Sequence, residues 1–543
     1  MKRSLEALSN QLFDLAIIGG GVNGAATARD AALRGLKVAL VEARDFSSGT
    51  SSRSSKLIHG GLRYLKQGEW KLVREARRER RLLLQLAPHL ARPLPFCLPI
   101  FSGDPYSPLE IRLGLWLYDL LGNLGPRDRH RMIPRAEALR EMPRLRAEGL
   151  RTVALYHDSE TDDARLTLEY LLDAAAHGAV VANYAEVEAL ETAPTADGRP
   201  VRIAAAQVVD KLTGSRHRLA ARFWVNATGP WVDRVRALLP RYDGIPTVRL
   251  TKGTHIIIPP VTGRYAMFAA IPPSDRIFVL APWHGYALLG TTDTDFDGPP
   301  ESVAPDRADA EYLLHAVNRV LREPLTLADV RNSFAGLRAL VLQPGVSPSQ
   351  NTREYRFHED PWVGNFITIC GGKLTTARSL GETLAARVAS RLGQSDRGYP
   401  GRTAPFPGAP EQDFEVFVAD ATRQAVEDFK IPAATAERLA RTYGRRARQV
   451  LETLRREPRL AEPLPGEPSL LAAEVAFALD EEMALTLEDF LLRRSGLNWF
   501  AASGFDAALP VVASIFAERL GWTPVQRDVA IQAFTVTSKA LSV

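Results

Sequence analysis

Three glycines near the amino terminus stand at the spacing that binds a dinucleotide. Gly19, Gly21 and Gly24 form the frame G-x-G-x-x-G, and Glu42 follows 18 residues after the third glycine. In this frame the first glycine permits a tight turn, the second lets the backbone approach a pyrophosphate, and the third lets a helix pack closely on a strand. The helix N-terminus holds the pyrophosphate, and the acid accepts a hydrogen bond from the ribose. The frame predicts a dinucleotide cofactor without distinguishing NAD from FAD.

Three further segments carry residues that suit the same cofactor. Residues 44–65 are rich in serine and glycine, which let a backbone wind closely around a planar cofactor; a mobile polar loop is the alternative for this segment alone. Gly229 follows a strand-like run, and Gly371 and Gly372 follow another just before Lys373. Amides after such glycines point freely at a ligand. We therefore expect distant segments to converge on one cofactor.

The elements around the glycine frame alternate in type. Residues 15–18 are a short apolar run, residues 25–33 have helical composition, and residues 37–41 are a second apolar run. A strand, helix and strand in this order make a right-handed crossover, so the two strands are parallel in a sheet covered by helices.

The middle of the chain is rich in predicted strands. Residues 185–190, 201–209 and 218–225 have strand patterns, with a turn signal at 211–214, and predict an antiparallel meander. Further strand-like runs, separated by proline and glycine turns, lie at 255–258, 276–280, 286–289 and 366–369.

Proline and glycine crowd residues 393–413, where we place a domain boundary. Beyond it the patterns predict helices only, and no repeat of fixed period is visible. The predicted helices are 414–428, 434–456, 469–494 and two more after Pro510.

The composition is typical of a multidomain enzyme. The chain has 543 residues, 45% hydrophobic and 24% charged, and a net charge of +5 that is too small to indicate nucleic-acid binding. Cys97 and Cys370 are far apart, which supports neither a disulfide framework nor a zinc site and favours a reducing compartment. The first residues have no apolar stretch followed by a small-residue cleavage site, so we expect no secretory signal there, and no apolar run is long enough to span a bilayer. We expect a cytoplasmic protein whose membrane contact is peripheral.

Several stretches occur in the order typical of a known family. They are IIGGGVNGAATARDAALRG (17–35), TSSRSSKLIHGGLRYL (50–65), VNATGPW (225–231), KGTHIIIP (252–259), LLGTTDTDF (288–296), GLR (336–338), TREY (352–355), GGKLTTAR (371–378) and TLEDFLLRR (486–494). On these residues the chain resembles the FAD-dependent glycerol-3-phosphate dehydrogenases, roughly over 12–390 and again in the tail. The stretch at 54–65 is the most specific.

The resemblance implies FAD as cofactor, oxidation of sn-glycerol 3-phosphate to dihydroxyacetone phosphate, and reoxidation by membrane quinone. A glycerol-3-phosphate oxidase that uses O2 and makes H2O2 is one alternative, and a flavin-containing sensor or binding protein is another. The implied fold is α/β plus α. It has a Rossmann-type FAD-binding domain (12–90, 150–250 and 350–392), a D-amino-acid-oxidase-like antiparallel-sheet substrate domain (91–149 and 251–349) and an all-helical C-terminal domain (410–543).

The resemblance assigns cofactor contacts to residues from each of these stretches. They are Gly19, Gly21, Gly24, Glu42, Thr50, Ser51, Ser55, Lys56, Leu57, Gly229, Gly371, Gly372, Leu374 and Thr375.

A phosphate dianion is best bound by guanidinium and ammonium groups. The resemblance places Arg63, Arg338, Arg353 and Lys373 at the substrate end, with Tyr64 and Thr376 as neutral donors. Arg338 is also a catalytic candidate, because phosphate binding and alkoxide stabilisation are not separable from the sequence.

Oxidation of an alcohol also needs a group that takes the hydroxyl proton. His59 and His255 are the candidate bases, since an unperturbed histidine pKa of about 6.5 is near working pH. A hydrogen-bonded structural role is the alternative for each. It is stronger for His255, which lies in an apolar run.

The spacing of three acids matches the start of an EF-hand calcium loop: Asp293, Asp295 and Asp297. Ala304, however, occupies the position where that loop requires glutamate. We therefore predict no metal site. A turn is expected instead, and the resemblance implies that Thr291 and Asp293 lie near the flavin.

A quinone partner requires a membrane-facing patch. Residues 70–86 predict a helix with a basic face, suited to anionic headgroups; Glu75 and Glu79 interleave it, so a solvated helix with ion pairs is the alternative. We expect reversible contact with the inner face of the cytoplasmic membrane. The tail helices suit a homodimer, a membrane contact or support of the catalytic body. The basic face consists of Lys71, Arg74, Arg78 and Arg81.

Overall fold

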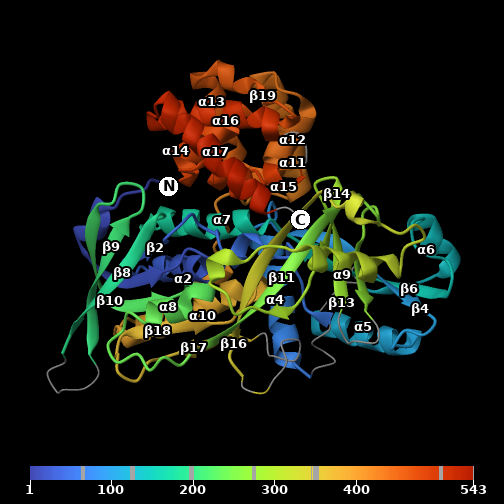
Figure 1. The fold of residues 1–543 in the computed structure, drawn as a ribbon, viewed down its shortest axis with the longest axis horizontal. Coiled ribbons are helices and arrows are strands. Elements are labelled where there is room, and N and C mark those ends of the chain that lie inside the picture. Colours follow the sequence, from blue (N-terminus) through green and yellow to red (C-terminus); the bar gives the residue numbers. More distant parts are fainter. Residues whose placement is uncertain are drawn as a thin grey trace.

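The computed structural model describes residues 1–62, 68–122, 129–194, 201–271, 277–343, 345, 354–500 and 505–541. In these ranges the chain forms two large sheets with their covering helices, and a helical domain lies against one side of both (Figure 1).

The first sheet has eight strands among the described residues and contains the predicted strand, helix and strand unit. β1 (Leu12–Ile18) and β2 (Val38–Val41) are parallel neighbours connected by α2 (Val22–Leu33). On the other side of β1 lies β10 (Arg216–Asn226), followed by β18 (Phe366–Cys370), both parallel to it. Because parallel strands end at the same edge of a sheet, the turns after β1, β10 and β18 meet there.

The remaining strands of the first sheet extend it at both ends. β7 (Val180–Ala182) pairs with β2, and β17 (Arg356–His358) pairs with β18. β8 (Ala185–Ala193) and β9 (Arg202–Asp210) pair antiparallel and lead into β10, which confirms the predicted meander. α7 (Asp163–Ala176) and α10 (Ala377–Arg391) pack against α2.

The second sheet has ten strands among the described residues, and most of its neighbours are antiparallel. Alternate side chains of its strands enter two apolar clusters, one under α6 (Arg135–Glu141) and α9 (Arg307–Asn318), the other under α4 (Trp70–Leu86) and α5 (Pro108–Gly122). Its strands are β3 (Leu57–Ile58), β4 (Arg92–Phe101), β5 (Arg131–Pro134), β6 (Leu150–Glu160), β11 (Val248–Ile258), β12 (Ala266–Ala270), β13 (Ile277–Trp283), β14 (Tyr286–Gly290), β15 (Thr294–Asp295) and β16 (Asn332–Val341).

The chain passes between the two sheets several times. β3 and β6 belong to the second sheet, although both lie in ranges predicted for the FAD-binding domain. They are joined to that sheet by pairing with each other and with β4, which local patterns do not specify. The predicted domain limits stay a prediction.

The C-terminal domain begins after the predicted break, with Asp413 capping the first helix, α11. The domain is helical, as expected, apart from one hairpin that the sequence patterns missed: β19 (Pro463–Leu464) pairs with β20 (Glu467–Leu471). Its helices are α11 (Phe414–Phe429), α12 (Ala433–Tyr443), α13 (Ala447–Arg456), α14 (Ala472–Glu482), α15 (Leu497–Phe500), α16 (Phe505–Leu520) and α17 (Pro524–Ala540).

Three predicted helix limits in this domain differ from the structure. The helix over 434–456 is broken at Gly444, which has φ +55° and contacts Gly408 too closely for any side chain. The helix over 469–494 starts as a strand, because a Pro-Gly turn at 465–466 makes the hairpin, and it ends in a π-helical turn at Asp489–Arg494. α16 begins before Pro510 instead of after it.

Candidate functional site

A large cavity of about 1980 Å³ lies where the carboxyl edge of the first sheet meets the second sheet. This volume exceeds the range of roughly 300–1,000 Å³ typical of small-ligand pockets, and it suits a dinucleotide with a substrate beside it. Most of the predicted site residues that the structure describes line the cavity. They are Gly19, Gly21, Glu42, Thr50, Ser51, Ser55, Leu57, His59, Gly229, His255, Arg338, Gly371, Gly372, Lys373, Leu374 and Thr375.

The three glycines of the frame have different surroundings. Gly19 has φ +112°, and a Cβ there would lie 2.7 Å from the carbonyl oxygen of Ala227. A Cβ on Gly24 would lie 2.0 Å from the carbonyl oxygen of Gly19, so this glycine serves helix packing and does not line the cavity. At Gly21 a Cβ would meet only Ser51 Oγ, at 3.1 Å. The cavity wall at Gly21 is therefore open to a ligand, at the start of α2 where the first helical amides lie.

The carboxylate of Glu42 is held at the cavity wall by two backbone amides. Gly20 N donates to Oε2 at 2.7 Å, and Arg44 N donates to Oε1 at 2.9 Å. Burial raises the pKa of Glu42, and the two amide hydrogen bonds oppose that rise. A carboxylate fixed in this way is suited to accept a hydrogen bond from a ribose hydroxyl.

The turns after the three parallel strands are in direct contact. Ala227 N donates to the carbonyl oxygen of Ile18 at 2.8 Å, and Asn23 Nδ2 donates to the carbonyl oxygen of Gly371 at 3.2 Å. A Cβ on Gly372, which has φ +107°, would lie 2.9 Å from Asn23 Nδ2. The structure thus brings together the segments that the sequence predicts to converge.

Asn23 is a site residue that sequence reasoning missed. It lines the cavity, and its buried Oδ1 has no hydrogen-bond partner among the residues that the structure describes. Since buried polar atoms are nearly always paired, this oxygen fits a donor on a bound ligand. The residue occupies a variable position of the glycine frame, to which the frame assigns no chemistry.

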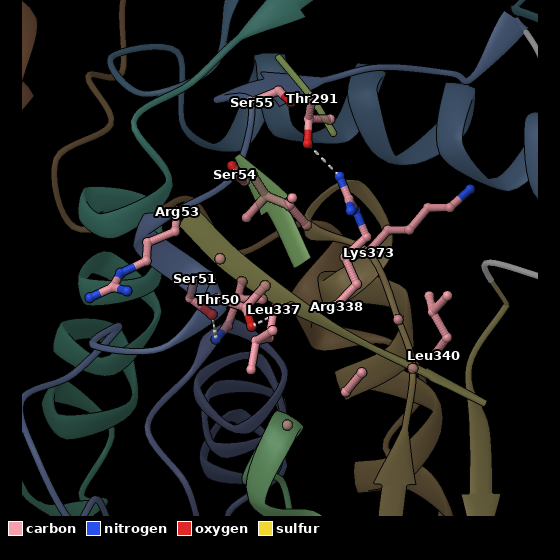
Figure 2. A pocket seen from close by; sticks show the side chains of 18 of the residues that line it. Thr50, Ser51, Arg53, Ser54, Ser55, Thr291, Leu337, Arg338, Leu340 and Lys373 are labelled. Carbon is pink, nitrogen blue, oxygen red and sulfur yellow. Dashed lines mark hydrogen bonds between the residues drawn. The ribbon is translucent and has the colours of Figure 1, made fainter. Parts of the chain in front are cut away.

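The segment 44–58 joins the glycine turn to the second sheet. Thr50 Oγ1 donates to the carbonyl oxygen of Leu337 at 2.5 Å, and Ser51 Oγ accepts from Val22 N at 2.9 Å (Figure 2). The hydroxyl of Ser55 shares a hydrogen bond of 2.8 Å with His255 Nε2. These small hydroxyl residues therefore fix the cavity wall through backbone and side-chain contacts.

Lys56 is placed differently from its predicted role. Its ammonium donates to Asp163 Oδ1 at 2.6 Å and to the carbonyl oxygen of Ser52 at 3.1 Å, and the residue does not line the cavity. A buried ammonium requires a carboxylate partner, and Asp163, at the start of α7, supplies it. The side chain of Lys56 thus stabilises the segment instead of facing the ligand space.

Arg338 is directed into the cavity from β16. Its Nη2 donates to Thr291 Oγ1 at 2.7 Å (Figure 2), and its Nη1 forms an ion pair of 3.3 Å with Asp293. A Cβ on Gly253 of the neighbouring strand β11 would lie 2.5 Å from Nη2, so that glycine leaves room for the guanidinium. Lys373 lines the same cavity from the turn after β18. Two cations from distant segments thus line one cavity, together with Thr291 and Asp293. That Thr291 and Asp293 lie near the flavin stays a prediction.

His59 follows the end of β3, is half-buried and lines the cavity. Its backbone N donates to Thr375 Oγ1 at 3.2 Å, which ties this segment to the turn that carries Lys373. Burial lowers the pKa of His59, the charge of Lys373 lowers it further, and Asp158 opposes the shift. The imidazole is therefore neutral near pH 7 and able to accept a proton.

The pKa of His255 is far below the usual value for histidine. Burial, Arg338 and Lys56 together lower the pKa of His255 to about 3. A Cβ on Gly290, opposite it in the sheet, would lie 2.1 Å from its Cδ2, so the ring occupies space that only glycine leaves. A histidine with so low a pKa is a weak base, and this surrounding favours the structural alternative, in which His255 fixes Ser55.

Of the other predicted substrate residues, the structure describes only Thr376. Arg63, Tyr64 and Arg353 lie outside the described residues, so their roles stay predictions. Thr376 is buried in the same turn as Thr375 but does not line the cavity.

Sequence reasoning missed the apolar wall. It is formed by Phe268, Ile277 and Val279 from β12 and β13. Alternation along each strand shows which residues share a face, but only the sheet order shows that this face meets the cavity.

The chain matches two family descriptions. Residues 14–387 match "FAD dependent oxidoreductase", and residues 401–527 match "C-terminal domain of alpha-glycerophosphate oxidase". The glycerol-3-phosphate dehydrogenase of Synechocystis sp. is 36% identical, over 98% of this chain and 97% of the relative. The aerobic glycerol-3-phosphate dehydrogenase of Staphylococcus aureus is 34% identical, over 97% of this chain and 94% of the relative.

Solved structures of other proteins have a similar fold. The glycerol-3-phosphate dehydrogenase from Bacillus halodurans, complexed with FAD, superposes with a TM-score of 0.81 at 30% identity, covering 99% of this chain and 96% of that one. The L-alpha-glycerophosphate oxidase from Mycoplasma pneumoniae, with FAD bound, has a TM-score of 0.53 at 18% identity, over 72% of this chain and 98% of that one. At that identity the second likeness concerns the fold alone.

Proposed function

Because the chain belongs to the FAD-dependent oxidoreductase family and is similar over its length to glycerol-3-phosphate dehydrogenases, we propose that it oxidises sn-glycerol 3-phosphate to dihydroxyacetone phosphate and delivers the electrons to membrane quinone. The observation that carries this proposal is the position of Arg338 and Lys373 in the cavity of the glycine turns. A flavin site with two cationic side chains suits an alcohol that bears a phosphate dianion. An amino-acid substrate, with a single carboxylate, would need fewer.

The cavity residues fit FAD. The backbone at Gly21 and the first amides of α2 would hold the pyrophosphate. Glu42 would accept a hydrogen bond from a ribose hydroxyl, and Oδ1 of Asn23, which has no partner among the described residues, would accept one from another donor on the cofactor. Bound there, FAD supplies the acceptor for the hydride that leaves the substrate carbon. Side chains of this chain would bind and orient the substrate and accept its hydroxyl proton.

Arg338 and Lys373 would bind and orient the substrate. The hydrogen bonds from Arg338 to Thr291 and Asp293 fix the direction of its guanidinium before the substrate arrives. Such preorganisation lowers the cost of placing the substrate for reaction. The same positive charge would also stabilise negative charge that develops on the hydroxyl oxygen as its proton leaves.

We assign the proton acceptor to His59. It lines the cavity, and its lowered pKa keeps it neutral at working pH. His255 is the weaker candidate, since the pKa of its imidazole is about 3 and its Nε2 is engaged with Ser55. His255 would hold the 44–58 segment in place.

The proposed membrane contact rests first on α5, which has a stripe of exposed apolar side chains. Its members are 59–64% exposed and are spaced by four, three and four residues. Ile111, Gly114 and Leu117 of the same helix line the cavity, so the cavity extends to the helix that would meet the lipid. An amphipathic helix of this kind lies in the membrane interface. The stripe consists of Leu109, Leu113, Trp116 and Leu120.

The neighbouring helix α4 adds positive charge to this surface. Lys71, Arg74, Arg78 and Arg81 are exposed on it, as the sequence predicts. Its acids are directed inward: Glu79 pairs with Arg378, and Glu75 accepts from Ser379. Glu79 also contacts Arg78, but within the described helix these two acids form no ion pair with its other exposed cations. This arrangement favours binding to anionic headgroups over a merely solvated helix.

No helix within the described ranges is long and apolar enough to cross a bilayer. We therefore propose reversible, peripheral binding at the inner face of the cytoplasmic membrane. A homodimer stays a prediction, which light scattering of the purified protein would test.

The acceptor is tested by comparing quinone and oxygen. Purified FAD-loaded protein is given sn-glycerol 3-phosphate, and reduction of a soluble quinone analogue is measured beside oxygen uptake and peroxide formation. We expect quinone reduction to exceed oxygen uptake. Dominant peroxide formation would instead support the oxidase, and glycine or unphosphorylated glycerol reacting as well as the phosphate ester would reject the substrate assignment.

A further inference from the structure

Asp45 lies three residues after Glu42 and contacts two arginines from the far end of the chain. It is fully buried, and Arg494 binds it with two hydrogen bonds, Nη1 to Oδ2 at 2.8 Å and Nη2 to Oδ1 at 2.9 Å. Arg493 Nε donates to the same Oδ2 at 2.6 Å. Both arginines belong to the C-terminal domain, at the end of the stretch TLEDFLLRR.

The two arginines are themselves fixed by their own segment. Arg493 also donates to Glu488 at 2.7 Å and to Asp489 at 2.8 Å, and Arg494 donates to the carbonyl oxygen of Glu482 at 2.9 Å. Arg493 and Arg494 are each only 4% exposed. Because buried charges must be paired in a fixed geometry, Asp45 has one position that satisfies both guanidinium groups.

A second connection joins the same two segments. Tyr184 OH donates to Asp489 Oδ1 at 2.7 Å. The backbone of Tyr184 donates to the carbonyl oxygen of Arg44 at 2.9 Å, and that of Ala185 donates to the carbonyl oxygen of Glu42 at 2.7 Å. The 488–494 segment is thus linked both to the side chain of Asp45 and to the backbone on either side of Ala43.

Residues 42–51 form the cavity wall beside the glycine turn. Ser47 N donates to the carbonyl oxygen of Gly20 at 3.2 Å, and a Cβ on Gly20 would lie 2.7 Å from the ring of Phe46. Glu42, Arg44, Ser48, Gly49, Thr50 and Ser51 of this segment line the cavity. A shift of Asp45 would therefore move both the carboxylate of Glu42 and the wall beside the pyrophosphate turn.

We propose that Arg493 and Arg494 are positioning residues for FAD: through Asp45 they hold the 42–51 segment in the shape that binds the adenosine half of the cofactor. The C-terminal domain is then part of the FAD site, although none of its residues lines the described cavity. This inference rests on FAD as the cofactor and not on the proposed substrate or acceptor.

The experiment compares Arg494→Gln with Arg446→Gln. Arg446 also joins the C-terminal domain to the first sheet's helices, through Glu169 of α7 at 3.2 Å, and it pairs with Glu482 of its own domain at 2.9 Å; neither partner lies in the 42–51 segment. Flavin is removed from each protein, and the dissociation constants for FAD and for ADP, a probe of the adenosine half alone, are measured at a temperature where all variants are folded.

We expect Arg494→Gln to weaken the affinity for FAD and for ADP by about tenfold or more, because a charge-assisted contact is lost. Arg446→Gln should leave both affinities within about threefold of those of the unsubstituted protein. Arg494→Lys, which keeps the charge, should recover part of the loss. If Arg494→Gln does not fold, Asp45→Asn is measured in its place and should weaken the affinity for ADP to a similar extent.

Equal affinities in the Arg494→Gln and Arg446→Gln proteins would overturn the proposal, because both substitutions loosen the same domain contact. An unchanged ADP affinity in Asp45→Asn would overturn it as well. Since the readout is nucleotide affinity, failure of the proposed substrate reaction would leave these outcomes unaffected.

Discussion

Arg338 Nη2 donates a hydrogen bond of 2.7 Å to Thr291 Oγ1, so a guanidinium on one strand is fixed by the turn that follows another. Gly253 makes this possible, because any side chain there would occupy the position of the guanidinium. The positive charge is consequently directed into the cavity and held there, which distinguishes it from the many solvated arginines of the surface.

Arg338→Ala should lower kcat/KM for sn-glycerol 3-phosphate by about a hundredfold or more, since a charge-assisted contact to the substrate is lost. Arg249→Ala is the matched control, because Arg249 pairs with Asp295 in the same sheet and does not line the cavity. Steady-state kinetics at saturating acceptor measure both. A decrease in Arg338→Ala no larger than in Arg249→Ala would reject the assigned role.

Gly21→Val should abolish FAD retention with little effect on folding. A Cβ at Gly21 meets only Ser51 Oγ, at 3.1 Å, so the space it would fill belongs to the ligand. Gly24→Ala, in contrast, should prevent folding, because its Cβ would lie 2.0 Å from the carbonyl oxygen of Gly19. The flavin-to-protein ratio and circular dichroism separate the two effects. A Gly21→Val protein that keeps its full flavin content contradicts the pyrophosphate assignment.

The buried His255 should make the fold less stable in mild acid. The pKa of His255 is lowered from 6.5 to about 3, so between these values the unfolded chain binds a proton that the folded chain does not. The contribution of His255 to the free energy of unfolding is therefore fully present above pH 6.5, and it falls by about 1.4 kcal/mol for each pH unit between pH 6.5 and about pH 3. Denaturant unfolding between pH 6.5 and pH 4 should show a shallower slope for His255→Gln than for the unsubstituted protein. Parallel slopes would argue against a buried neutral His255.

Substituting the apolar stripe of α5 should release the protein from membranes. We expect Leu113→Glu combined with Trp116→Glu to reduce binding to phosphatidylglycerol vesicles by about tenfold or more, because two apolar side chains no longer enter the interface. The control is Val525→Glu with Val529→Glu on α17, whose valines are 72% and 58% exposed. Co-sedimentation measures both variants, and equal losses would contradict a specific docking surface.

Local patterns were sufficient for elements whose determinants are close in sequence. The strand, helix and strand around Gly21 were predicted, and the helix at 70–86 has the predicted limits, because apolar periodicity and glycine spacing are local signals. The meeting of the turns at Gly19, Gly229 and Gly371 was predicted from the glycines that follow each strand-like run, because backbone amides there can face one ligand.

Relationships between distant residues could not be predicted in this way. The ammonium of Lys56 pairs with Asp163, and nothing near Lys56 in the sequence indicates that partner. The link from Asp45 to Arg494 spans almost the whole chain. The break at Gly444 depends on the backbone of Gly408, which is visible only after packing. In each case the decisive partner is brought close by tertiary structure alone.

We propose that this cavity holds FAD beside a phosphate-bearing alcohol bound by Arg338 and Lys373. Anaerobic spectroscopy of the FAD-loaded protein tests it most directly. We predict that sn-glycerol 3-phosphate bleaches the visible flavin absorption, that a quinone analogue restores it, and that Arg338→Ala requires far more substrate. A flavin that dithionite bleaches but saturating sn-glycerol 3-phosphate leaves oxidised would contradict this substrate assignment.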